Sequence, residues 1–353
     1  MSAPSSSMGD TMTDTPFDRP ASPPAPARPV RPFFWSVRRE LWENPAIWIA
    51  PLAVAALVIV GACVAALSTH GGKSVHRTVA TAAQTAPPSQ TTTISQSTPD
   101  GGVTVQKVIK VEGPPPTPEQ RRAMVALPFY MVTAAMLVTM FLVAVFYCLG
   151  GLFNERRDRS ILFWKSLPVG NLTTVLAKIV APMVILPAVT LAIALATEVT
   201  LYAIGALAFA THGQGADADV PVPFADIVAV AAYSTVVLSL WWAPVYAWLL
   251  MVSGWAKRAP FLWAVLPPLG LAVAERIAFG TTYLGRLIQS RLTGAGETAF
   301  VVPKPPAHGI PSIGIEQIDA AKFVSSPGLW LGLLAAAGMI AVAVWMRRRR
   351  EPI

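Results

Sequence analysis

The chain has few charged residues for its length. Only 13% of its 353 residues are Asp, Glu, Lys or Arg, whereas a soluble domain has about a quarter. Hydrophobic residues make up 54%. This composition excludes an ordinary soluble protein and predicts one that crosses a membrane several times. The net charge of +8 does not indicate nucleic-acid binding, because the basic residues separate apolar runs instead of gathering in one soluble domain.

Cysteine and histidine are also scarce. Cys63 and Cys148 lie in different apolar runs, at depths roughly 20 Å apart, which excludes a disulfide between them. The sequence Gly71-Gly72-Lys73-Ser74 is not a phosphate-binding loop, because Leu67 stands where that loop needs a glycine. The histidines have no carboxylate or cysteine at metal-ligand spacing; they are His70, His76, His212 and His308. We therefore expect no enzyme activity, no metal and no bound cofactor.

Six apolar runs are long enough to cross a hydrocarbon core of roughly 30 Å and predict an all-α membrane protein. The third belongs to an apolar stretch over 173–210, which would measure about 57 Å as one helix. We therefore expect this span to end near 196, with a separate interfacial or external helix over 199–210. The fourth run is expected to kink near Pro244. The six predicted spans are 46–67, 124–153, 174–196, 225–252, 261–279 and 328–346.

The distribution of lysine and arginine predicts the orientation. With both termini in the cytosol, the inner segments hold sixteen of these residues and the longer outer segments hold eleven. Residues 68–123 and 280–327 are then external loops, and 102–112 alternates enough for one strand. Residues 1–31 are rich in Ser, Pro and Ala and are expected to form a disordered cytosolic tail. Residues 32–353 form the membrane domain.

Two segments beside the membrane have the composition of protein-binding helices. Residues 32–44 place Phe34, Val37 and Leu41 at helical spacing opposite charged residues, as an interfacial amphipathic helix does. Residues 154–170, which we call the hinge, combine charges with Ile161-Leu162-Phe163-Trp164, which is too apolar for an idle loop. The alternative for both segments is simple anchoring in the headgroup layer.

The hinge carries a family resemblance. The run Glu155-Arg156-Arg157-Asp158-Arg159-Ser160-Ile161-Leu162-Phe163-Trp164-Lys165-Ser166-Leu167-Pro168, leading to Leu176-Ala177-Lys178, resembles the first cytosolic loop of bacterial ABC transporter permeases of the type-2, exporter-like class. The resemblance implies a permease subunit in the bacterial inner membrane that pairs with a second permease subunit and with a separate cytosolic ATPase, which binds the ATP.

The same resemblance implies roles for individual residues. In this class the loop between spans two and three is a coupling helix that docks on the ATPase. By resemblance, the coupling residues are Glu155, Arg156, Arg157, Asp158, Arg159, Phe163, Trp164 and Lys165. The helix before the first span would support them through Phe34, Arg38, Arg39, Leu41 and Trp42.

The alternatives to an ABC permease are a secondary transporter and a sensory or structural membrane protein. Ionisable residues near the spans help to distinguish them. A secondary transporter is expected to have charges at mid-depth or an inverted repeat. We expect Lys178 to reach the inner surface and Glu198 to lie near the outer surface. Glu275 and Arg276 also lie near a span end, and the sequence assigns them no role.

Overall fold

The computed structural model describes residues 32–68, 118–158, 170–212, 222–301 and 314–349. Within these ranges nearly every residue is helical, and the one β pairing is a bridge between Phe300 and Ile318. Six stretches are long and apolar enough to cross a membrane; they are Ala46–Leu67, Arg121–Arg157, Asn171–Leu207, Phe224–Trp241, Pro260–Phe279 and Pro327–Arg349. The expected tail over 1–31 and strand over 102–112 lie outside the described residues.

A short helix precedes the first membrane-length helix and is set off from it at Pro45. Helix α1 spans Pro32–Glu43, and α2 spans Ala46–Ser68. A proline disfavours the helical conformation of the residue before it, so the two helices separate at Asn44. The Asn44 side chain donates to the Glu40 carbonyl (3.0 Å), which satisfies an acceptor left free at the end of α1.

The second and third membrane-length stretches are the longest. Helix α3 spans Pro118–Gly151, and α4, Phe153–Arg157, follows it directly. The third stretch continues from α6 (Asn171–Val180) through the π-helical turn η2 (Ala181–Ile185) into α7 (Leu186–His212).

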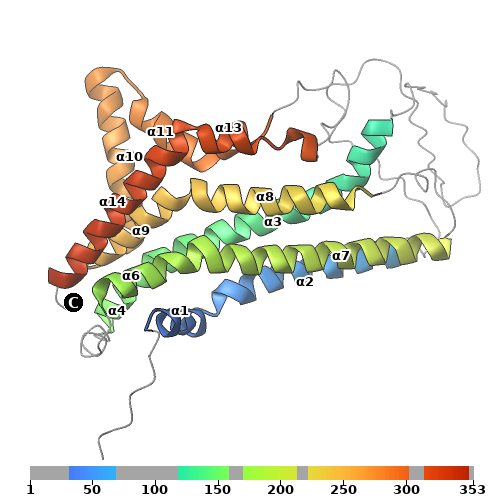
Figure 1. Ribbon diagram of the computed structural model, residues 1–353, viewed down its shortest axis with the longest axis horizontal. Helices are drawn as coiled ribbons and strands as arrows, with labels where there is room; N and C mark the ends of the chain where they lie inside the picture. Colours follow the sequence, from blue (N-terminus) through green and yellow to red (C-terminus); the bar gives the residue numbers. More distant parts are fainter. Residues whose placement is uncertain (1–31, 69–117, 159–169, 213–221, 302–313, 350–353) are drawn as a thin grey trace, which may run out of the picture.

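The prediction of a separate helix over 199–210 is therefore wrong, because α7 continues without a break to His212. Pro182 cannot donate a backbone hydrogen bond, and η2 accommodates it in a wider turn that does not end the helix. Helix α7 then packs along α2 and α3, which lie beside it in Figure 1. The expected helix length was based only on the thickness of the hydrocarbon core. That estimate does not include the packing against α2 and α3.

The fourth apolar run has the predicted kink. Helix α8 spans Phe224–Trp241, α9 spans Ala243–Trp255, and the break falls at Trp242. Pro244 lies in the first turn of α9, where a missing N–H costs no helical hydrogen bond. Alone, α8 is long enough to be a candidate span, whereas α9 is a shorter apolar helix.

The last two membrane-length helices differ in how much of them is covered. Helix α10 (Pro260–Phe279) runs across the direction of α2, α3 and α7 in Figure 1, and Ala264 is its one buried residue. Helix α14 (Pro327–Arg349) packs along α9 and ends in basic residues.

Short helices connect α10 to α14, and they pack on α8. These are α11 (Tyr283–Thr293), α12 (Ala295–Ala299), η3 (Ile315–Gln317) and α13 (Ala320–Ser325). The Trp241 indole donates to the Ser290 carbonyl (3.1 Å), and the Tyr233 hydroxyl donates to the Ala299 carbonyl (3.0 Å). The described residues of 280–301 are thus attached to the bundle by polar groups of α8.

Candidate functional site: a buried charge cluster

One end of the bundle brings together charged side chains from helices that are far apart in the sequence. Helices α1, α4 and α6 and the last turns of α14 lie near one another at this end (Figure 1). We define the charge cluster as Arg39, Glu40, Glu155, Lys178 and Arg347. Four of the five side chains are buried, and Arg39 is half-buried.

Glu40 connects α1 to α6 and α3. One of its carboxylate oxygens, Oε1, accepts from the Lys178 ammonium (2.8 Å) and from the Arg39 guanidinium (2.9 Å). The other, Oε2, accepts from the Tyr147 hydroxyl (2.9 Å). A carboxylate is expensive to bury without such partners, so α1 is held in this position by its neighbours.

Glu155 makes the second set of contacts, at the start of the hinge. Its Oε1 lies 3.1 Å from the Lys178 ammonium and 3.3 Å from the Arg39 guanidinium. Its Oε2 accepts from Arg347 of α14. Lys178 and Arg39 therefore each bridge two carboxylates, one on α1 and one on α4.

The charges of this region balance. The cluster has three cations and two carboxylates, and Glu43 adds a third carboxylate 3.4 Å from Arg39. Removing one partner of a buried ion pair typically costs about 3–5 kcal/mol, because the other charge is left uncompensated. The cluster therefore fixes the relative positions of α1, α4, α6 and α14.

The charge cluster and burial affect the pKa values of Arg39 and Glu43, at the edge of the cluster, in different ways. Burial acts to lower the pKa of Arg39, but Glu40, Glu43 and Glu155 outweigh it and leave that pKa raised. Burial raises the pKa of Glu43, and Arg39 opposes this. The charged form of Glu43 is thus less favourable in the folded protein than in water.

A further cation attaches α4 to the end of α9. Arg156 is buried and donates to the carbonyls of Gly254 (2.8 Å) and Ala256 (3.2 Å). The carbonyls at the end of a helix lack internal partners and carry partial negative charge, so a guanidinium is a suitable donor there.

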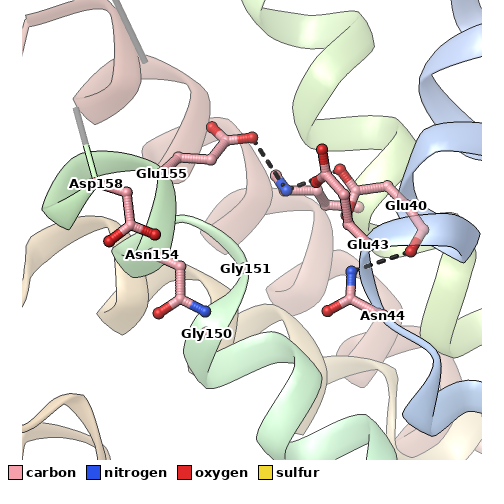
Figure 2. A pocket seen from close by; sticks show the side chains of 9 residues that line it. Glu40, Glu43, Asn44, Gly150, Gly151, Asn154, Glu155 and Asp158 are labelled. Carbon is pink, nitrogen blue, oxygen red and sulfur yellow. Dashed lines mark hydrogen bonds and ion pairs between the residues drawn. The ribbon is translucent and has the colours of Figure 1, made fainter. Parts of the chain in front are cut away.

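A cleft of about 360 Å³ lies beside the cluster (Figure 2). Its wall is mainly acidic and amide-bearing, with one ammonium. A side chain at Gly151 would come within 3.1 Å of Leu250, so this glycine allows α3 to pack closely on α9. The lining residues are Glu40, Glu43, Asn44, Gly150, Gly151, Asn154, Glu155, Asp158 and Lys178. Among the described residues, no three His, Cys, Asp or Glu side chains are placed to hold a metal ion.

The residues expected to couple to a partner fall into three groups. Glu155 and Arg156 are buried and bonded within the chain. Arg157 and Asp158 are exposed and pair with each other at 3.2 Å. The remaining residues of that set lie outside the described part of the chain; they are Arg159, Phe163, Trp164 and Lys165.

Helix α1 was expected to support the coupling residues, and most of its side chains named for that role are exposed. Phe34 and Trp42 are 60% and 73% exposed, and Arg38 is exposed between the rings of Trp35 and Trp42. Leu41 packs against the core of the bundle. Arg39 belongs to the charge cluster.

Sequence reasoning missed four residues of this region. These residues are Glu40, Tyr147, Lys178 and Arg347, of which Lys178 was expected to reach the inner surface of the membrane. A detectable signal was present: Glu40 and Glu155 are acidic residues near span ends on the side where basic residues prevail. Such residues are often paired with the surrounding cations.

Glu198, which was expected near the outer membrane surface, is covered by neighbouring helices of the bundle. Its side chain is fully buried, and its Oε1 accepts from the Thr133 hydroxyl of α3 (2.7 Å). By contrast, Glu275 holds the start of α11, since it accepts from the backbone N–H groups of Tyr283 (2.7 Å) and Leu284 (2.8 Å). Arg276 is exposed.

No protein-family profile matches the chain, and comparisons with curated proteins and with solved structures give no match. The class is therefore defined by the molecule itself. The six long apolar helices among the described residues give the chain the make-up of a helical, multi-pass membrane protein.

Proposed function

We propose that the chain is the transmembrane permease subunit of an ABC transporter of the bacterial inner membrane. In this proposal both termini are cytosolic, a separate ATPase subunit hydrolyses the ATP, and a second permease subunit completes the pathway. Transport is most simply export, in keeping with the class that the hinge resembles. The chain changes conformation during transport, and the separate ATPase supplies the energy.

The observation that supports this proposal is the position of α4. Its Glu155 is bonded to α6 and α14 through Lys178 and Arg347, and its Arg156 is bonded to the end of α9. The hinge begins in this helix, so a force applied to the hinge is passed to three apolar helices through charge-assisted hydrogen bonds. Such bonds are roughly twice as strong as neutral ones. This is a mechanical connection that a coupling segment requires.

Helix α1 contributes a second route. Glu40 and Arg39 attach α1 to the same cluster, whereas Phe34, Arg38 and Trp42 remain exposed. A partner that contacts the exposed side of α1 therefore acts on the same set of helices as one that contacts the hinge. The two segments are expected to work as one coupling surface.

The test is reconstitution with and without the ATPase. Purified alone, the chain should neither bind nor hydrolyse ATP, because its sequence has no phosphate-binding loop. Co-expressed with an ABC ATPase encoded beside it, it should purify as a complex of defined stoichiometry that hydrolyses ATP. ATP hydrolysis by the pure chain, or transport driven by an ion gradient without any ATPase, would refute the proposal and favour a secondary transporter.

A further inference from the structure

Glu198 lies deep in the apolar part of the bundle. Helix α2 has no charged residue, and its Ala55 joins Val132 and Ala194 in one apolar cluster. Ala55 is about 14 Å from the first residue of α2 and about 18 Å from Leu67, so this cluster is near the middle of the apolar stretch. Glu198 follows Ala194 by one helical turn. Its partner Thr133 is about 17 Å along α3 from Arg122, where the charged start of the helix ends, and about 27 Å from Gly151.

Among the residues that the structure describes, no lysine or arginine contacts this carboxyl. Helices α2 and α7 contain no lysine or arginine, and the arginines of α3, at 121 and 122, lie about 17 Å along the helix from Thr133. Among the described groups, Tyr130 of α3 interacts electrostatically with Glu198 and with Asp226 of α8. Tyr130 and Asp226 are neutral or negative. They cannot compensate a carboxylate.

Only one of the two carboxyl oxygens of Glu198 has a hydrogen-bond partner among the described residues. Thr133 donates to Oε1, while Oε2 is buried and has no partner. An ionised carboxylate in an apolar environment costs far more than a neutral carboxylic acid with one unmade bond. A metal cation would need several oxygen ligands, and Thr133 is the one described side chain bonded here. A proton bound to the carboxyl needs no further oxygen ligand.

We propose that Glu198 is a proton-binding site, with the proton on Oε2 at neutral pH and the Thr133 hydroxyl bonded to Oε1. Release of the proton would leave a bare charge between α3 and α7, so it requires water to reach Oε2 and the α3–α7 contact to open. Proton occupancy is thereby linked to the packing of these two helices. The site is independent of the proposed ATPase, since none of its groups belongs to the charge cluster or the hinge.

The test is infrared spectroscopy of the full chain in lipid nanodiscs at pH 7. We expect a carbonyl-stretch band of a protonated carboxylic acid that is absent from the spectrum of Glu198→Gln. The band should shift in Thr133→Val, which removes its hydrogen-bond donor. Identical wild-type and Glu198→Gln spectra in this region would overturn the proposal.

A second measurement decides the question if Glu198→Gln does not fold. Dicyclohexylcarbodiimide reacts with protonated carboxyls in apolar surroundings, and peptide mass mapping locates the adduct on the wild-type protein. Labelling is expected at Glu198 and not at Glu155, which is buried to a similar degree but bonded to Lys178 and Arg347. Failure to label Glu198 at pH 7, or equal labelling of both, would overturn the proposal.

Discussion

Replacing Lys178 tests whether the charge cluster holds the helices together. Lys178→Met keeps an unbranched chain of similar length but removes the cation that bridges Glu40 and Glu155. Each carboxylate keeps other partners: Tyr147 and Arg39 for Glu40, and Arg39 and Arg347 for Glu155. The expected loss is therefore near the lower end for a broken buried ion pair, about 3 kcal/mol of the free energy of unfolding.

The assay is reversible unfolding of the purified protein in mixed micelles with increasing sodium dodecyl sulfate. Lys257→Met is the matched control, because Lys257 is exposed; it should change the free energy by no more than about 0.5 kcal/mol. The double variant Lys178→Met, Glu40→Gln should be less unstable than the sum of the single variants, by about 0.5–3 kcal/mol. Strict additivity, or a Lys178→Met variant as stable as the control, would refute the reasoning.

Two further predictions use the same end of the molecule and its orientation. Arg156→Ala should lose about 2–3 kcal/mol of stability in the same assay, because it leaves the Gly254 and Ala256 carbonyls unpaired. The control is Arg157→Ala, which removes an exposed charge and should lose less than about 0.5 kcal/mol. Equal losses in the two variants would contradict this account. A cysteine placed at Thr92 in a chain without Cys63 and Cys148 should react with an impermeant thiol reagent added outside the cell, whereas one at Asp158 should be spared; the reverse pattern would overturn the proposed orientation.

The helices themselves were largely predictable from the sequence. The apolar runs over 46–67, 261–279 and 328–346 differ from α2, α10 and α14 by a few residues at most, because hydrophobic length is a local property. The kink near Pro244 was predictable for the same reason. The extent of α7 was not, since it depends on packing against α2 and α3.

The candidate site was predictable only in part. Glu155 and Arg156 were singled out, but as residues facing a partner, whereas the structure pairs them within the chain. Glu40 is 138 residues from Lys178 in the sequence, and no local pattern connects them. The burial of Glu198 was not predictable, because its contact with Thr133 joins residues that are 65 positions apart in the sequence.

The most direct test of the proposed function is the affinity of the ATPase for the chain in nanodiscs. Aromatic anchors at an interface typically contribute about 2 kcal/mol or more each, so Phe163→Ala, Trp164→Ala should weaken ATPase binding by roughly thirtyfold or more for each anchor removed. Membrane insertion should remain normal. The matched control is Trp48→Ala, Phe146→Ala, which removes one exposed tryptophan and one exposed phenylalanine from apolar helices and should leave the affinity unchanged. Wild-type affinity in the hinge variant would contradict the coupling role.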